Sequence, residues 1–318
     1  MFENNNEYLI SGILNKYVGD ATVVVIPEGI TEIADSAFEN GKVTEVVFSS
    51  TVEKVGDNAF KNCASLKKVA FTGSIKRFGY DAFAECTSLE KVEFDGDIGD
   101  WLNISFAGYT SNPLYYGALF VKGEKLNELI IDADEVGAYA FCGLDVDKLV
   151  FRRPLKRIGS GAFSDCKYKG ALDVDVEEIG ELAFRGTAFP EIRLGKTLKS
   201  VESWAFFRCS AAKVFYEGNL KEWLSVFIRD VWANPAYDAE LYVGGEKLID
   251  ISIPDGVETV GDAAFAGVKI KSVTFNDGVK RIGEAAFYGC EELERVYGIS
   301  PTTYVHPDAF ALCANLNK

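Results

Sequence analysis

The sequence has a single histidine, His306, among its 318 residues. A serine or cysteine hydrolase built on a histidine base would have to use it, and no nucleophile is marked near it. No C-x-x-C pair and no Cys/His pair at metal-ligand spacing occurs, which argues against zinc. Glycines stand singly and form no phosphate-binding loop. These absences predict a protein that is not an enzyme and uses no metal and no cofactor.

Basic residues are also scarce, with 33 Lys and Arg against 48 Asp and Glu and a formal net charge of -15. A nucleic acid or an anionic membrane would require a basic face, so neither is expected as a partner. No apolar run approaches the ~20 residues that span a bilayer, so no membrane insertion is expected. Residues 1–7 lack the basic start and apolar stretch of a signal peptide, which favours the cytoplasm if the chain is full length.

What the chain has in abundance is an Ala-Phe pair, repeated mostly 21 to 23 residues apart. The phenylalanines of these pairs are Phe38, Phe60, Phe83, Phe141, Phe163, Phe184, Phe206, Phe265, Phe287 and Phe310. A fixed period of this length is typical of a solenoid, in which each turn buries its apolar face against its neighbours.

Each repeat has the same internal pattern. A β-branched residue or Leu, usually followed by Gly as in Ile158-Gly159, precedes the pair, and an alternating run such as Leu66-x-x-Val69-x-Phe71 follows it. The alternation predicts a short strand, and the Gly predicts a corner where a side chain would not fit. Six of the seven cysteines stand three residues after the repeat Phe, which predicts buried free thiols at one inward-facing position.

The resulting pattern, I-G-x-x-A-F-x-x-C-x-x-L-x-x-V-x-F, is accompanied by Ile26-Pro27-Glu28-Gly29 and Ile253-Pro254-Asp255-Gly256 between turns. It resembles the BspA-like leucine-rich repeat family of bacterial and some protist proteins, from about residue 20 to the C-terminus. The resemblance implies a leucine-rich-repeat solenoid, a right-handed and β-dominated coil. It also implies adhesin-like binding of a host or matrix protein, at the cell surface or after secretion.

We predict one solenoid domain over residues 1–318, with about twelve turns of 21–23 residues, because each turn contacts only adjacent turns. Residues 1–22 are expected to form an N-terminal cap that includes a hairpin around Gly12. Modified turns with insertions are expected at about 95–130 and 217–252, each carrying roughly 15 extra residues and a short amphipathic helix.

The two insertions are themselves a repeat. Trp101-Leu102 and Asn112-Pro113 in the first match Trp223-Leu224 and Asn234-Pro235 in the second, at an offset of 122 residues. Each Asn-Pro pair predicts the start of a turn.

Binding candidates come from two surfaces. Outward-facing strand residues form a row that is mixed in sign and varied from turn to turn, which suits an irregular protein partner: Lys68, Lys91, Glu93, Lys148, Arg152 and Phe215. The insertions add aromatic residues of the kind favoured at binding hot spots, which also pack local loops: Tyr109, Tyr115, Tyr116, Trp232 and Tyr237. We therefore predict a non-enzymatic protein-recognition module. Two alternatives remain open, namely carbohydrate binding through Tyr115, Tyr116 and Trp232, and an architectural spacer within a larger surface protein.

Overall fold

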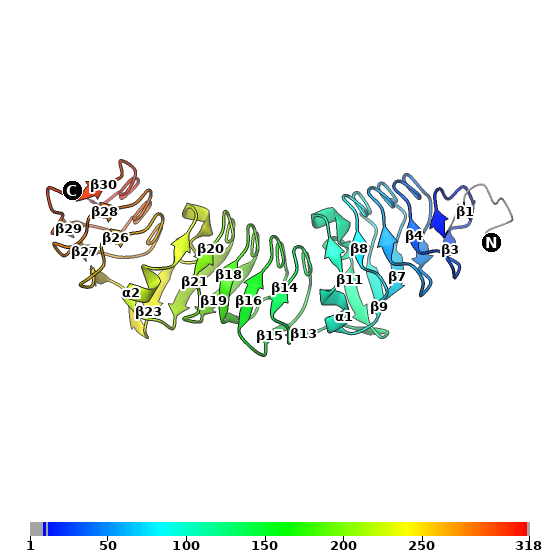
Figure 1. Cartoon of the computed structure of the whole chain (residues 1–318), viewed down its shortest axis with the longest axis horizontal. Helices are drawn as coiled ribbons and strands as arrows, with labels where there is room; N and C mark the ends of the chain where they lie inside the picture. Colours follow the sequence, from blue (N-terminus) through cyan, green and yellow to red (C-terminus); the bar gives the residue numbers. More distant parts are fainter. Residues whose placement is uncertain (1–8, 11, 317–318) are drawn as a thin grey trace. The chain divides into compact units, whose positions relative to one another are not determined.

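The computed structural model describes residues 9–10 and 12–316. It confirms a β-solenoid of leucine-rich-repeat type, with about 13 turns and little helix. The chain divides into two compact units: Met1–Lys148 with Gly161–Lys167 form unit 1, and Leu149–Ser160 with Tyr168–Lys318 form unit 2 (Figure 1). One domain over residues 1–318 stays a prediction. Within the described residues, no helix is both long enough and apolar enough to cross a membrane.

Unit 1 contains two sheets of strands taken from successive turns. We call the sheet with the longer strands the main sheet; it runs in the order β12 (Glu124–Lys125), β11 (Ala118–Val121), β9 (Lys91–Asp95), β7 (Lys68–Thr72), β5 (Glu45–Val47), β3 (Val23–Val25). The minor sheet runs β1 (Leu9–Ile10), β2 (Ile13–Leu14), β4 (Glu32–Ile33), β6 (Lys54–Val55), β8 (Arg77–Phe78), β10 (Ser105–Phe106). Successive turns pair in parallel, as a solenoid requires.

The N-terminal edge of unit 1 is a hairpin. β1 pairs antiparallel with β2 around Gly12, whose φ of +81° is accessible to glycine without strain. β2 then pairs in parallel with β4 and joins the minor sheet. Residues 1–8 of the expected 1–22 cap lie outside the described residues, so the capping role stays a prediction.

Unit 2 repeats this plan. Its main sheet runs β17 (Leu172–Val174), β19 (Ala188–Leu194), β21 (Ser210–Tyr216), β23 (Glu240–Val243), β24 (Glu246–Lys247), and its minor sheet includes β16 (Leu155–Ile158), β18 (Val176–Ile179), β20 (Ser200–Val201), β22 (Phe227–Ile228). A second pair of sheets follows: β25 (Asp250–Ser252), β27 (Ser272–Thr274), β29 (Arg295–Tyr297), and β26 (Thr259–Val260), β28 (Arg281–Ile282), β30 (Tyr304–Val305). The strands near the unit boundary are β13 (Glu128–Ile131), β14 (Glu135–Val136) and β15 (Lys148–Phe151).

The repeat phenylalanines form the core. In unit 1 the rings of Phe38, Phe60 and Phe83 are stacked with centroids 4.9 and 5.3 Å apart. In unit 2 the rings of Phe265 and Phe287 are 5.3 Å apart. Backbone hydrogen bonds also hold the stack in register. Where two ordinary repeats follow each other, the Phe amide donates to the Ala carbonyl of the next turn, as from Phe60 to Ala82 at 2.8 Å.

Two other expectations hold for part of the repeats, since a Cβ at Gly137 or Gly261 would meet no atom within 4 Å and Cys166, Cys209 and Cys313 are only half-buried. A Cβ added at Gly56 would lie 2.4 Å from the Asp35 carboxylate of the preceding turn, so the corner excludes a side chain. All seven cysteines, which lie within the described residues, are free thiols. The Cys63 thiol donates to the Phe38 carbonyl of the preceding turn at 3.0 Å. Burial raises the pKa of Cys63 to about 11, so it acts as a small apolar residue.

The insertions differ from the expectation of one enlarged turn each. In the first, Ala118 of β11 pairs with Lys91 of β9, so that turn has 27 residues. It contains α1 (Ile98–Leu102), η1 (Tyr109–Ser111) and η2 (Pro113–Tyr115). A tight β11–β12 hairpin then ends the main sheet. The second contains α2 (Leu220–Trp223) and η3 (Val231–Ala233), and the β23–β24 hairpin ends its sheet in the same way. We call these segments, residues 96–127 and 218–249, the first and second modified turns.

Neither modified turn contains an Ala-Phe pair, so no Phe amide is present to donate to the Ala carbonyl of the next repeat. Side-chain donors take its place. The indole nitrogen of Trp101 donates to the Ala140 carbonyl at 2.8 Å, and that of Trp223 donates to the Ala264 carbonyl at 3.0 Å. The amide of Asn112 donates to the same Ala140 carbonyl at 3.0 Å. Through these bonds the Trp and Asn side chains connect each modified turn to the repeat that follows it.

Candidate binding surfaces

The main sheet of unit 1 carries a paired row of charges. The Lys68 ammonium lies 2.9 Å from the Glu45 carboxylate and 2.8 Å from that of Glu93. Glu93 also pairs with Lys91, whose ammonium lies 4.5 Å from the centroid of the Phe120 ring. The structure thus brings together the predicted residues Lys68, Lys91 and Glu93, through β5, β7, β9 and β11.

These ion pairs shift the titration of the row. Hydrogen bonds from Lys68 and Lys91 lower the pKa of Glu93, and hydrogen bonds to Glu93 and Glu45 raise the pKa of Lys68. Both groups stay charged over a wide pH range, and each is largely compensated within the protein. The row therefore presents a fixed pattern of alternating charge with little net field.

The main sheet of unit 2 carries an aromatic row. The rings of Phe215 (β21) and Tyr242 (β23) stack with centroids 4.6 Å apart. The Arg193 guanidinium (β19) lies 4.4 Å from the centroid of the Phe215 ring and pairs with Glu191 at 2.8 Å. Of these, sequence reasoning identified only Phe215, although register pairing of Arg193, Phe215 and Tyr242 follows from the repeat.

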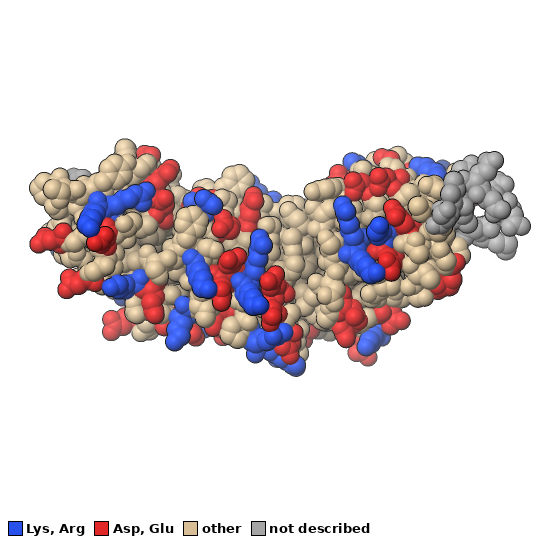
Figure 2. Space-filling view, viewed as in Figure 1, with Lys and Arg blue, Asp and Glu red and all other residues tan. Residues whose placement is uncertain are grey.

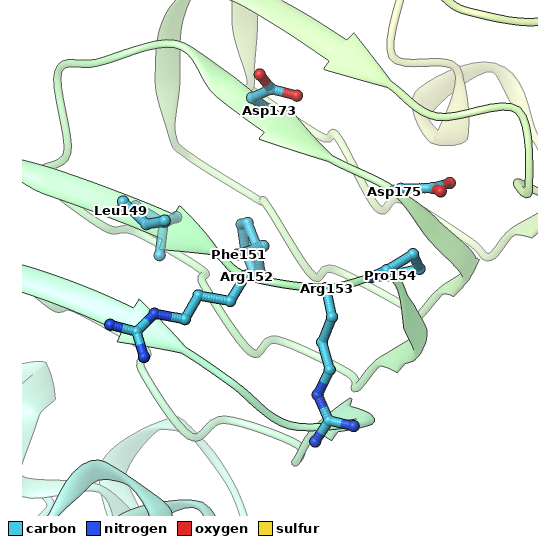
Figure 3. Close-up of a pocket in the computed structure, with 8 residues that line it drawn as sticks. Leu149, Phe151, Arg152, Arg153, Pro154, Asp173 and Asp175 are labelled. Carbon is cyan, nitrogen blue, oxygen red and sulfur yellow. The ribbon is translucent and has the colours of Figure 1, made fainter.

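The predicted residues Lys148 and Arg152 are in a different setting. Lys148 pairs with Glu128 at 2.6 Å in unit 1. Arg152 and Arg153 line a shallow cavity of about 390 Å³ in unit 2, together with Asp173 and Asp175. Figure 3 shows both guanidinium groups directed away from the two carboxylates. The charges do not converge on one point, as a site for a small charged ligand would require.

Acidic and basic side chains are interleaved over the face shown in Figure 2. Among residues 9–10 and 12–316, no group of three or more His, Cys, Asp or Glu side chains lies close enough to hold a metal ion. The described surface therefore offers mixed charge and aromatic rows rather than a field of one sign.

The aromatic residues of the first modified turn are used mainly in packing. The hydroxyl of Tyr116 accepts a hydrogen bond from the Glu85 amide at 3.1 Å, and burial raises the pKa of Tyr116. Its ring meets that of Tyr115 edge-on at 5.1 Å. The ring of Tyr109 meets that of Tyr139 edge-on at 4.9 Å.

The second modified turn and the repeat before it present a larger aromatic group. The rings of Trp232 and Tyr237 lie 4.9 Å apart, and Phe207 meets Trp232 edge-on at 5.6 Å. Trp204 adjoins Phe207 at 6.0 Å and is half exposed. Sequence reasoning identified Trp232 and Tyr237 but not Trp204 or Phe207, which lie in the preceding repeat. A residue-by-residue comparison of the two repeats that precede the insertions would have shown them.

A family model and several solved structures match the chain. A family model described as the BspA type leucine rich repeat region matches the chain in six copies, over residues 16–113, 170–225 and 239–318. A search of curated proteins finds no match.

Solved structures give low-identity matches. A leucine rich cell surface protein from Faecalibacterium prausnitzii is 20% identical, with 91% of each chain covered and a TM-score of 0.39. A leucine-rich repeat protein from Bacteroides ovatus is 18% identical, with 96% of this chain and 88% of that chain covered and a TM-score of 0.43. The pneumococcal vaccine antigen PcpA is 16% identical, with 93% and 73% covered and a TM-score of 0.44.

Proposed function

This chain belongs to the BspA-type leucine-rich repeat family, and from that premise we propose that it is a non-enzymatic module that recognises another protein. The observation that carries the proposal is the stack of Arg193, Phe215 and Tyr242 across three strands of the unit 2 main sheet. Aromatic and arginine side chains supply most of the binding energy at protein interfaces.

The rigidity of this row supports the proposal. Glu191 holds the guanidinium of Arg193, and the Tyr242 hydroxyl donates to Glu240 at 2.9 Å. Side chains that are already ordered lose less conformational entropy on binding, which raises affinity. The sequence of charged and aromatic residues changes from turn to turn, so the row suits an irregular protein surface better than a repetitive polymer.

The family suggests the form of this activity, which is adhesin-like binding of a host or matrix protein at the cell surface or after secretion. The charge row of Lys68, Lys91 and Glu93 would contribute specificity and orientation more than affinity, because its members are paired within the chain.

Surface plasmon resonance against a panel of purified matrix and plasma proteins tests the proposal. We expect at least one specific partner, and we expect the double variant Arg193→Glu/Phe215→Ala to bind it about 10-fold or more weakly, which equals a loss of ~1.4 kcal/mol. Lys199→Glu is the matched control, because Lys199 precedes β20 of the minor sheet and its ammonium pairs with Glu177 there. Equal binding by the double variant and the control would exclude the main sheet as the recognition surface.

A further inference from the structure

The second modified turn borders a cavity of about 240 Å³ in unit 2. Its lining includes the rings of Trp232 and Tyr237, the side chains of Arg208 and Ser210, and Asp238. Trp232 remains 39% exposed, although it contacts both Phe207 and Tyr237. The cavity is therefore a small recess with aromatic walls and polar groups at its edge, which is the usual composition of a small-ligand site.

The first modified turn shows how the corresponding space is filled there, although the backbone differs at one position, since φ is +59° at Asp238 and -113° at Tyr116. Tyr116 there occupies the position of Asp238, and its hydroxyl reaches the Glu85 amide. Glu85 in turn corresponds to Arg208, since each lies two residues after its repeat Phe and each has a left-handed backbone. Asp238 is too short to span the same distance, so the space between it and Arg208 remains open as part of the cavity.

The residue that forms the aromatic wall of the cavity, Trp232, also differs between the two modified turns. Trp232 corresponds to Thr110, because the carbonyls of these residues accept from the Phe206 and Phe83 amides, respectively. The Thr110 hydroxyl simply donates to Asp81 at 2.7 Å. At the position of Asp81 the repeat before the second modified turn has Trp204, which packs against Phe207 and does not line the cavity. Thr110 makes the equivalent backbone bond in the first modified turn, so that bond does not require a tryptophan at position 232.

We propose that this cavity binds one neutral pyranose unit of a glycan. A pyranose ring has an apolar C–H face, which matches the amphipathic ring of Trp232, and a rim of hydroxyls. The planar groups of Arg208 and Asp238 match such a rim, since each can bond two neighbouring hydroxyls. Lys269 pairs with Asp238 at 3.1 Å, yet the Asp238 side chain remains 84% exposed and able to accept from a ligand.

Charge and size narrow the ligand class. Asp238 is already paired with Lys269 and shares the cavity edge with Arg208, so the charges at the site nearly balance within the protein and a neutral sugar needs no further compensation. The cavity volume suits a single ring and is too small for several peptide side chains. This site is formed by the second modified turn and the preceding repeat up to the start of β21, and its lining includes none of Arg193, Phe215 and Tyr242. It therefore goes beyond the protein-recognition role and does not depend on it.

A glycan array and saturation-transfer NMR with neutral methyl glycosides, both on the full chain, test the site. We expect neutral hexose-containing glycans to bind, with saturation transfer to the C–H face of the sugar. Trp232→Thr introduces the residue found at the same place in the first modified turn and should fold normally, as a thermal melt would show. Asp238→Tyr places a bulky residue at a φ of +59°, as Tyr139 and Leu182 already do elsewhere in the chain, so it should fold with a melting temperature lowered by that strain. Each should weaken binding about 10-fold or more, and Tyr115→Ala in unit 1 should leave it unchanged.

Three results would overturn the proposal. The first is an array on which no neutral glycan binds the wild-type chain. The second is a preference for anionic glycans. The third is glycan binding that survives both substitutions; if Trp232→Thr instead abolished capture of a matrix protein while no glycan bound, the recess would be a protein contact. The main-sheet variant Arg193→Glu/Phe215→Ala should keep glycan binding, which separates this test from that of the protein-recognition role.

Discussion

The first and second modified turns share a frame but differ in what fills it. In each, a buried Trp and a buried Asn donate to the carbonyl of the Ala in the next repeat, and a hairpin ends the main sheet. Only the second turn replaces a filling tyrosine with Asp238 and adds Trp232. The comparison separates residues that join the turns from residues that are left available for a ligand.

The largest expected loss of stability comes from removing the buried tryptophan that occurs in both modified turns. Trp101→Ala and Trp223→Ala should each lower the free energy of unfolding by ~3–5 kcal/mol, because a fully buried indole and its hydrogen bond are lost. Urea unfolding measures this. The half-exposed Trp204 is the control, and Trp204→Ala should cost less than ~1 kcal/mol. A large loss at one modified turn and a small loss at the other would refute the common frame.

The shared asparagine should rank next. The Asn234 amide donates to the Ala263 carbonyl at 2.8 Å, and its oxygen accepts from the Ala236 amide at 2.8 Å. Asn234→Ala and Asn112→Ala should each cost about 1–3 kcal/mol in the same urea assay, since buried backbone groups lose their partners. Asn103, on the exposed side of α1, is the control, and Asn103→Ala should cost no more than ~0.5 kcal/mol. Comparable losses in all three variants would argue against the bridging role.

A smaller loss of stability is expected from adding a Cβ atom where each modified turn approaches the next repeat. Gly143 and Gly267 have φ of +78° and +69°, and an added Cβ would lie 2.7 Å from the Leu114 carbonyl or 2.5 Å from the Tyr237 ring. We expect Gly143→Ala and Gly267→Ala to cost about 1–3 kcal/mol through backbone strain and contact. Gly261→Ala should be nearly neutral in a thermal melt, because a Cβ there meets no atom within 4 Å. Similar shifts in melting temperature for all three would count against the close approach.

The smallest effect concerns two equivalent cysteines. Burial raises the pKa of Cys86 to about 12 and that of Cys209, which lines the proposed sugar site, to about 11. At pH 8 iodoacetamide should alkylate Cys209 faster than Cys86, because Cys209 is only half-buried whereas Cys86 is fully buried. Peptide mass spectrometry measures both rates, and equal rates would indicate that the second site is as closed as the first.

The same thiols have a stability consequence with a definite sign. Their pKa values are raised above the reference value of 9.0, so their contribution to folding is complete below pH 9. It is lost as the pH rises from 9 towards 11–12, where the unfolded thiols ionise and the folded ones do not. Urea unfolding at pH 8 and pH 10.5 should therefore show lower stability at the higher pH.

Sequence reasoning predicted the repeat because its signal is local. The spacing of Phe38, Phe60 and Phe83 is enough to predict their stack, and the position of Cys63 predicts a buried thiol. The duplication of Trp101 and Asn112 as Trp223 and Asn234 was also visible, but their hydrogen bonds to Ala140 and Ala264 were not. Those bonds join residues up to 41 positions apart and replace a backbone donor, which depends on where the sheet ends.

The candidate sites were predicted less completely. The grouping of Lys68, Lys91 and Glu93 follows from strand register, whereas Trp204 stands at a position whose residue type varies widely, from Asn58 to Leu182, and gave no periodic signal. Its proximity to Phe207 and Trp232 arises from the way the modified turn lies on the preceding repeat.

Isothermal titration calorimetry of a neutral methyl glycoside that scores on the array tests most directly the claim that the second modified turn is the open form of the first. The account predicts measurable heat for the wild-type chain, an unchanged titration for Tyr116→Asp at the filled site of unit 1, and no detectable binding for Asp238→Tyr, whose melting temperature is lowered only by the strain of Tyr at a φ of +59°. Equal titrations for the wild-type chain and Asp238→Tyr would contradict it.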